Sequence, residues 1–203
     1  LPIMLTPKIK DNKILDLCAA PGGKAFQVMS ENENIVLNDI SKKRIKILKE
    51  NMSRLGYSAV IKNYNALKFP EDEKFDLILL DTPCSAIGTI RSNPEIIFRK
   101  QSPNFNNLFK IQEELLIKSS KLLKPKGMLI YMACSFFYLE TIKPIKKFLE
   151  KNTNFSILKY NYAKQSKEIK SLLNKDGYFL TSPTKHNGYN IDGFFSIQLI
   201  KDE

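Results

Sequence analysis

The sequence lacks the features of several common classes of protein. No stretch approaches the roughly 18 uncharged apolar residues that a membrane-spanning helix needs. The N-terminal segment has no long apolar core of the kind found in secretory signals. We therefore expect a cytoplasmic protein without a membrane partner. The chain starts with Leu1 rather than Met, which indicates a fragment or a trimmed form.

Cysteine and histidine are scarce, and their spacing does not suit a metal site. The three cysteines, Cys18, Cys84 and Cys134, are an odd number without an export signal, which favours reduced thiols over a disulfide framework. The sequence has no CxxC pair and a single histidine, His186. This pattern predicts no metal ligand set. A catalytic Cys–His pair stays open, although no spacing supports it.

A glycine-rich dinucleotide motif is also missing. Without GxGxxG spacing, NAD and FAD lack their usual pyrophosphate-binding turn. The chain instead has the turn Ala20-Pro21-Gly22-Gly23 between a predicted strand and a predicted helix, where backbone N–H groups face a ligand. Asp39 ends the next predicted strand and either accepts the hydroxyls of a ribose or only caps a helix. S-adenosylmethionine, a nucleoside cofactor without a pyrophosphate, fits this pattern.

Positive charge is in excess. Lys and Arg number 32 against 21 Asp and Glu, which gives a formal net charge of +11. Such a surface attracts polyanions, of which RNA and DNA are the commonest. A composition bias towards lysine without any partner is the alternative explanation.

The order of apolar runs indicates one α/β domain. The 203 residues contain no internal repeat and no Gly/Ser/Pro-rich linker. Strand-like runs alternate with helical ones, which favours a doubly wound parallel sheet followed by a closing antiparallel hairpin. We predict strands at residues 12–18, 34–39, 59–64, 75–81, 128–133, 155–162, 178–181 and 194–200, helices at 24–30, 41–55 and 108–123, and a long functional loop at 91–107.

Two cysteines follow apolar strands directly. Cys84 comes after the run 75–81, and Cys134 after the run 127–133. Ligands bind at the carboxyl ends of parallel strands, so two thiols there suggest covalent chemistry. Burial as inert residues is the alternative for each of them. Methylation at carbon 5 of a pyrimidine needs such a thiolate, because that carbon becomes nucleophilic only after a cysteine adds to carbon 6. Asp81 is placed to hydrogen-bond the ring.

Five ordered motifs resemble those of one enzyme family. They are ILDLCAAPGGK at 14–24, NDISKKR at 38–44, LDTPCSAIGTIRSNPE at 80–95, LKPKG with YMACS at 123–135, and DGFF at 192–195. The set resembles the Sun/RsmB-type RNA (cytosine-5) methyltransferases of the NOL/NOP/Sun family. The matches run from about residue 12 to about residue 200, in the family's order.

The resemblance implies a class I S-adenosylmethionine-dependent methyltransferase with a Rossmann-like α/β fold, a mostly parallel seven-stranded sheet and a closing antiparallel hairpin. It implies a single catalytic domain at 1–203, without the family's N-terminal RNA-binding modules. Cys134 would be the nucleophile, Cys84 would assist product release, and Asp81 would contact the cofactor and the base. The cofactor would be bound by Cys18, Ala19, Ala20, Pro21, Gly22, Gly23, Lys24, Asp39, Asn65 and Asp81, and RNA by Lys24 and Arg91.

Two positions depart from the family pattern. Asn65 stands where the family usually has an Asp near the adenine, and Ala133 replaces the Thr before the second cysteine. The leading hypothesis is a cytosine-C5 methyltransferase acting on ribosomal RNA. A tRNA methyltransferase and a catalytically weakened, cofactor-binding assembly factor are alternatives. A DNA cytosine methyltransferase is disfavoured by the Ala-Cys-Ser sequence after the later strand. The sequence gives no indication of the oligomeric state.

Overall fold

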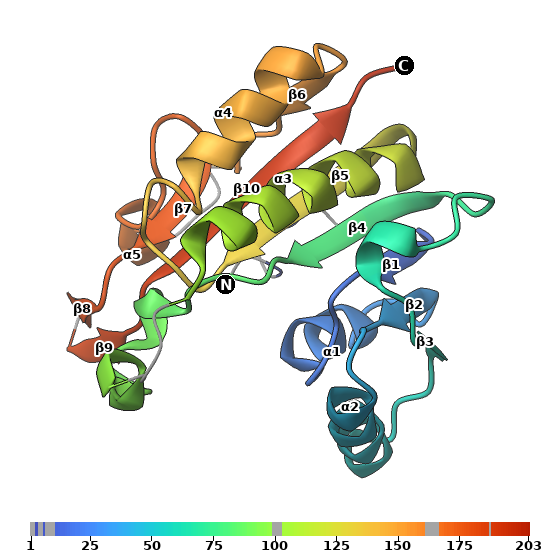
Figure 1. Cartoon of the computed structure of the whole chain (residues 1–203), viewed down its shortest axis with the longest axis horizontal. Coiled ribbons are helices and arrows are strands. Elements are labelled where there is room, and N and C mark those ends of the chain that lie inside the picture. Colours follow the sequence, from blue (N-terminus) through green and yellow to red (C-terminus); the bar gives the residue numbers. More distant parts are fainter. Residues whose placement is uncertain (1–2, 4–5, 7–10, 99–102, 161–166, 187) are drawn as a thin grey trace.

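A central sheet built mainly from parallel strands organises the protein (Figure 1). The computed structural model describes residues 3, 6, 11–98, 103–160, 167–186 and 188–203. The strand order is β3-β2-β1-β4-β5-β10-β6, and β7 also pairs with β10. The strands are β1 (Ile14–Asp16), β2 (Ile35–Asn38), β3 (Val60–Lys62), β4 (Phe75–Asp81), β5 (Leu123–Ala133), β6 (Phe155–Ile157), β7 (Tyr178–Thr181) and β10 (Phe194–Lys201), and β8 (Thr184–His186) with β9 (Tyr189–Ile191) forms a separate hairpin.

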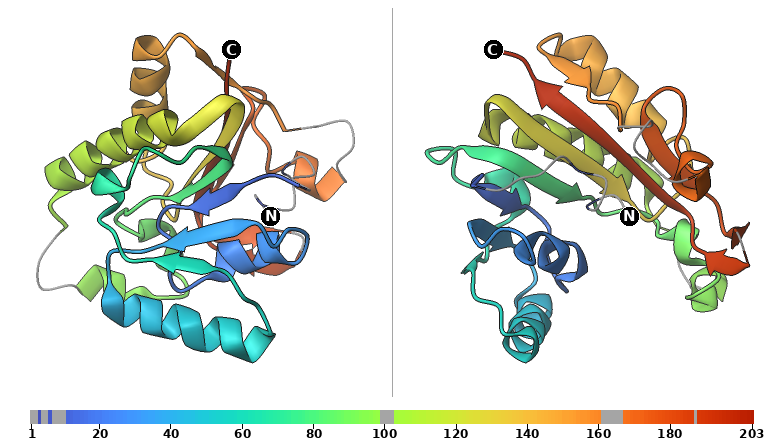
Figure 2. Two further views of the ribbon diagram at one scale, coloured as in Figure 1. Left: turned by 90° about the vertical axis from the view of Figure 1, so that its right-hand side faces the viewer. Right: turned by 180° about the vertical axis from the view of Figure 1, so that it is seen from behind.

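Helices cover both faces of the sheet (Figure 2). The helices are α1 (Gly23–Met29), α2 (Lys42–Leu55), α3 (Phe105–Leu122), α4 (Ile142–Lys151) and α5 (Lys167–Lys170), with short 3-10 turns η1 (Ala66–Lys68), η2 (Ile87–Thr89) and η3 (Pro94–Phe98). Among the described residues, no helix is long and apolar enough to cross a membrane.

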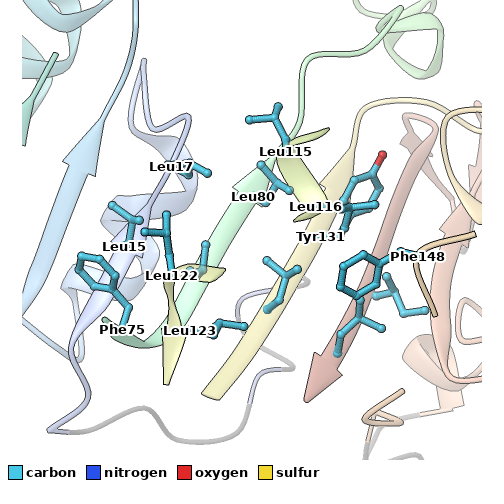
Figure 3. Close-up of a cluster of buried hydrophobic side chains, with 14 of the residues drawn as sticks. Leu15, Leu17, Phe75, Leu80, Leu115, Leu116, Leu122, Leu123, Tyr131 and Phe148 are labelled. Carbon is cyan, nitrogen blue, oxygen red and sulfur yellow. The ribbon is translucent and has the colours of Figure 1, made fainter. Parts of the chain in front are cut away.

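Alternation along the strands produces two apolar layers, because successive side chains of a strand point to opposite faces. On one face, Leu80 and Tyr131 pack with Leu115 and Leu116 of α3 and with Phe148 of α4 (Figure 3). On the other face, Leu79 and Ile130 pack with residues of α1 and α2. The continuous apolar runs of β4 and β5 are therefore explained by burial on both sides.

The predicted fold class is confirmed. The strand number differs from the seven expected: β10 runs antiparallel between β5 and β6, and β7 pairs with the same edge of β10 as β6, so the sheet has 8 strands among the described residues. β7 and β10 are the predicted antiparallel pair, with the β8–β9 hairpin inserted between them. The predicted helix at 41–55 is also confirmed, because the Ser41 side chain caps its start and Gly56 ends it in a left-handed conformation.

Some predicted boundaries were wrong. β5 begins at Leu123 instead of residue 128, because Leu123 pairs with Phe75 of β4 before a register shift. The predicted strand at 155–162 ends at Ile157, and its residues 161 and 162 lie outside the described residues. The predicted loop at 91–107 contains η3 and the start of α3, while residues 99–102 lie outside the description.

Candidate active site

A cavity of about 470 Å³ lies at the carboxyl ends of β1 and β4. Of the residues predicted to bind the cofactor, Cys18, Ala19, Ala20, Pro21, Gly23, Lys24 and Asp81 line it. Asp16, Met132, Thr181, Asp192 and Phe194 line it as well. The structure therefore brings the turn after β1 together with the end of β4 and with residues from the last part of the chain.

Gly22 shapes the turn between β1 and α1. It is the N-cap residue of α1, with φ of 112°, a value that favours glycine. A Cβ atom at this position would come within 2.2 Å of the Phe26 ring and within 2.8 Å of Leu48. Gly22 therefore supports the cavity wall through its backbone, although it is not among the lining residues described.

Asp39 is buried beneath the same turn. Its carboxylate accepts hydrogen bonds from the backbone N–H groups of Ala20, at 3.2 Å, and Ser41, at 2.9 Å. Arg44 pairs with this carboxylate and also donates to the carbonyl of Ala20. Through these contacts Asp39 holds the turn after β1 in place. Asp39 is not among the residues described as lining the cavity. Its expected contact with a ribose stays a prediction.

Asn65 is exposed and lies shortly after β3, the edge strand of the sheet. It is the N-cap residue of η1, and its side-chain oxygen accepts a hydrogen bond from the N–H of Leu67 at 3.0 Å. The residues described as lining the cavity do not include it. Its predicted contact with an adenine ring remains a prediction.

Three charged side chains meet in the cavity. The Lys24 ammonium donates to Asp81 Oδ2 at 2.5 Å and lies 5.4 Å from the centre of the Phe194 ring. Burial disfavours this ammonium, but the nearby Asp81 carboxylate and Cys134 outweigh burial and raise the pKa of Lys24. Asp16 is almost fully buried, and this burial, with the charge of Asp81, raises its pKa from 3.8 to about 7. The cavity thus holds the Lys24 ammonium in an ion pair with Asp81, beside the buried carboxyl group of Asp16.

The two candidate reactive thiols interact electrostatically with this cluster, although neither Cys84 nor Cys134 is among the residues described as lining the cavity. Burial raises the pKa of Cys84 to about 12, and the nearby Cys134 adds to the effect. Burial also raises the pKa of Cys134, but the Lys24 ammonium acts in the opposite direction. Of the two, Cys134 is therefore the one whose thiolate is stabilised by an active-site cation.

Close backbone contacts hold the strand ends around the thiols. Gly88 N–H donates to the Cys134 carbonyl at 3.1 Å, and Gly193 N–H donates to the Gly88 carbonyl at 2.7 Å. A Cβ atom on Gly88 would lie 2.0 Å from the Gly193 oxygen, so only glycine fits there. Arg91, predicted to bind RNA, is half-exposed and pairs with the cavity residue Asp192 at 3.1 Å.

Comparison with known proteins assigns this arrangement to a family. The family model described as 16S rRNA methyltransferase RsmB/F matches residues 2–200. The chain belongs to the RsmB/F family. This is a family of S-adenosylmethionine-dependent methyltransferases, as the sequence motifs predicted.

Relatives of the RsmB/F family differ from this chain in length. A ribosomal RNA small subunit methyltransferase B from Photorhabdus laumondii subsp. laumondii is 35% identical over 190 residues, covering 90% of this chain and 44% of the relative. The protein of that name from Enterobacter sp. (strain 638) is 34% identical over 203 residues, covering 98% and 44%. The chain thus spans less than half the length of these relatives.

A solved structure with the same architecture carries a bound molecule. The crystal structure of NSun6 from Pyrococcus horikoshii with SFG is 28% identical, with a TM-score of 0.80, and the match covers 100% of this chain and 52% of that one. A methyltransferase homologue from Pyrococcus horikoshii is also 28% identical, with a TM-score of 0.74, covering 98% and 64%.

Ala133, one of the two departures from the RsmB/F pattern, faces away from the cavity. It is fully buried in the same apolar layer as Tyr131 and Phe195, whereas its neighbour Met132 lines the cavity. A methyl side chain suits that layer. The absence of a threonine hydroxyl at this position therefore removes no polar group from the cavity wall.

Sequence reasoning missed several residues of the site. Asp16 could have been found, because it is an acid at the end of a strand, as are Asp39 and Asp81. Thr181 and Asp192 could not, because they reach the cavity only through the antiparallel pairing of β7 and β5 with β10. Among the residues described, no group of His, Cys, Asp and Glu side chains is arranged to hold a metal ion.

Proposed function

We propose that this chain transfers a methyl group from S-adenosylmethionine to carbon 5 of cytosine in RNA, through a covalent adduct between Cys134 and carbon 6. The observation that carries the proposal is the pair of thiols beside the Lys24–Asp81 ion pair, at the carboxyl ends of β4 and β5. The names of the bacterial relatives point to small-subunit ribosomal RNA as the substrate.

The cavity fits the cofactor. Its volume, about 470 Å³, is within the range of roughly 300–1,000 Å³ that is usual for small-molecule pockets. The carboxyl groups of Asp16 and Asp81 suit the amino group of the cofactor, and the turn at Gly23 allows close approach of the backbone. SFG, which the NSun6 structure contains, is an analogue of S-adenosylmethionine. When bound, S-adenosylmethionine supplies an electrophilic methyl group.

Each reactive side chain then has one task. The Cys134 thiolate, favoured by the nearby Lys24 ammonium, forms a bond to carbon 6 of the ring, and carbon 5 becomes nucleophilic. Asp81 holds Lys24 and the pyrimidine edge during attack. After methyl transfer, a base takes the proton from carbon 5, the electrons of that C–H bond form the double bond between carbons 5 and 6 again, and the carbon–sulfur bond breaks to release Cys134 as the thiolate. Cys84 assists this last step.

RNA would be held at the mouth of the cavity by Lys24 and Arg91. The target base must leave its stack to reach Cys134, so we expect an unpaired or flippable cytosine. Residues 1–203 would act as a single catalytic domain, with Asp39 and Asn65 on the nucleoside end of the cofactor.

Trapping the adduct tests the function. We expect the Cys84→Ala variant to accumulate a covalent protein–RNA species in the presence of cofactor, visible as a slowly migrating band in a denaturing gel. The double variant Cys84→Ala/Cys134→Ser should form none, because the attacking thiol is missing. Full methyl transfer by Cys134→Ser would disprove the assignment of the nucleophile. Binding of cofactor and RNA by the wild-type chain without methyl incorporation would favour an assembly factor instead.

A further inference from the structure

The two cysteine turns share one local design. Cys84 is followed by Ser85, and Cys134 by Ser135. The Ser85 hydroxyl accepts from the N–H of Ile87 at 3.3 Å, and the Ser135 hydroxyl accepts from the N–H of Phe137 at 3.2 Å. Each hydroxyl therefore closes its own turn and still has a proton to donate.

Both hydroxyls donate to the same carboxylate, that of Glu140. Ser85 Oγ and Ser135 Oγ each lie 2.6 Å from Glu140 Oε2. Glu140 Oε1 accepts the backbone N–H of Ser85 at 2.7 Å. One carboxylate thus bridges the residue after Cys84 and the residue after Cys134.

The bridge is buried and rigidly supported. Glu140 and Ser135 are 0% exposed and Ser85 is 4% exposed. The Glu140 carbonyl accepts from the Tyr131 hydroxyl at 2.8 Å, and its N–H donates to the Phe137 carbonyl at 3.0 Å. A buried carboxylate is costly unless it is hydrogen-bonded, so this one persists only in the geometry that satisfies it.

We propose that Glu140 is a positioning residue that sets the placement of Cys84 relative to Cys134. The proposal rests on the proposed function, in which Cys134 attacks the ring and Cys84 assists release. Glu140 acts on the placement of the two thiols through its hydrogen bonds with Ser85 and Ser135, and its negative charge also contributes to the raised pKa of Cys84. Each serine transmits the constraint to one cysteine, so the two chemical steps should be separable by substitution.

The serine variants provide that separation. In single-turnover assays with RNA and S-adenosylmethionine, we expect Ser135→Ala to lower the rate constant of methyl transfer about tenfold to 100-fold, because small misplacements of a nucleophile have effects of that size. We expect Ser85→Ala to leave this rate constant within about twofold of the wild type but to accumulate the covalent protein–RNA adduct. Glu140→Gln should show both defects, because the amide has only one acceptor oxygen, so that either the two serine hydroxyls or the Ser85 N–H faces an NH2 donor in place of an acceptor.

A purely structural role would give a different result. In that case all three variants would lose the same fraction of folded protein, measured by circular dichroism, and keep the wild-type rate and adduct level per folded molecule. That outcome, or an unaltered Glu140→Gln enzyme, would overturn the inference. Glu150→Gln, an exposed substitution on α4, is the matched control and should behave as the wild type. A wild-type chain that methylates no RNA would instead contradict the proposed function itself.

Discussion

At the wall of the cavity, Asp16 combines deep burial with a neighbouring carboxylate, and its pKa rises from 3.8 to about 7. A carboxyl group whose pKa is higher in the folded state binds its proton more tightly there than in the unfolded chain. The free energy of unfolding therefore falls as pH rises from about 4 to about 7, and levels off above that. A variant without the Asp16 carboxyl group should therefore not show this fall in unfolding free energy.

The Asp16→Asn variant tests this linkage. Relative to the wild type, we expect the variant to gain on the order of 3 kcal/mol of unfolding free energy between about pH 4.5 and about pH 8. Urea unfolding of both proteins across this range measures the difference, and other titrating groups cancel in the comparison. A difference that does not change with pH would contradict the raised pKa of Asp16.

Gly22 permits a second test at the residue scale. Gly22→Ala should lower the unfolding free energy by about 3 kcal/mol, because the added Cβ meets the Phe26 ring in an unfavourable backbone conformation. Gly23→Ala is the matched control, since a Cβ there meets no described atom within 4 Å. Chemical denaturation of the two variants gives the comparison. Equal unfolding free energies of Gly22→Ala and Gly23→Ala would contradict the prediction, because the turn would then accommodate the added Cβ atom without cost.

Among the elements, α4 shows where the sequence was a poor guide. Its residues 142–151 are rich in lysine and include Pro144, so no helix was predicted there. Pro144 lies in the first turn, where a missing backbone N–H has no helical partner to lose. The helix forms because Ile145 and Phe148 are buried against the sheet. By contrast, β4 was predicted correctly from its run of apolar residues, which is buried on both faces.

Packing of α4 can be measured directly. Phe148 is 4% exposed, and its ring lies 5.1 Å from that of Phe155 in an edge-on arrangement. We expect Phe148→Ala to lower the unfolding free energy by about 3 to 5 kcal/mol through loss of burial and formation of a cavity. Lys146→Ala, an exposed change on the same helix, should alter it by less than about 0.5 kcal/mol. A small effect at Phe148 would mean that α4 contributes little to the core.

The residues of the site, like the helices and strands, fall into those that local sequence patterns predict and those that they do not. The turn at 18–24 and Asp81 were predictable, because local strand–turn patterns determine them. Glu140 and Asp192 were not, because each has a partner far away in the sequence: Glu140 accepts hydrogen bonds from Ser85, 55 residues before it, as well as from the nearby Ser135, and Asp192 forms an ion pair with Arg91. Such contacts depend on the register of β5, β7 and β10, which no local pattern reveals.

At the scale of the whole molecule, the net charge of +11 should dominate the salt dependence of RNA binding. Cations that contact phosphates release counterions, so affinity falls as salt rises. We expect a loss of about tenfold or more between about 50 and about 200 mM salt. Fluorescence anisotropy with a labelled RNA measures it, and the affinity for S-adenosylmethionine over the same range is the control. An RNA affinity that does not depend on salt would exclude the basic surface as a binding determinant.

The carboxylate of Glu140, shared by the two serines, should also affect how these positions vary among related sequences. A mutation that removes this carboxylate removes the acceptor to which two buried hydroxyl groups and one backbone N–H donate. A mutation of one serine leaves the other still bound, and is the milder change. Descendant sequences should therefore lose the counterparts of Ser85 and Ser135 before that of Glu140. Across related proteins, we expect substitutions at these three positions to occur together more often than substitutions of either serine together with its neighbouring cysteine.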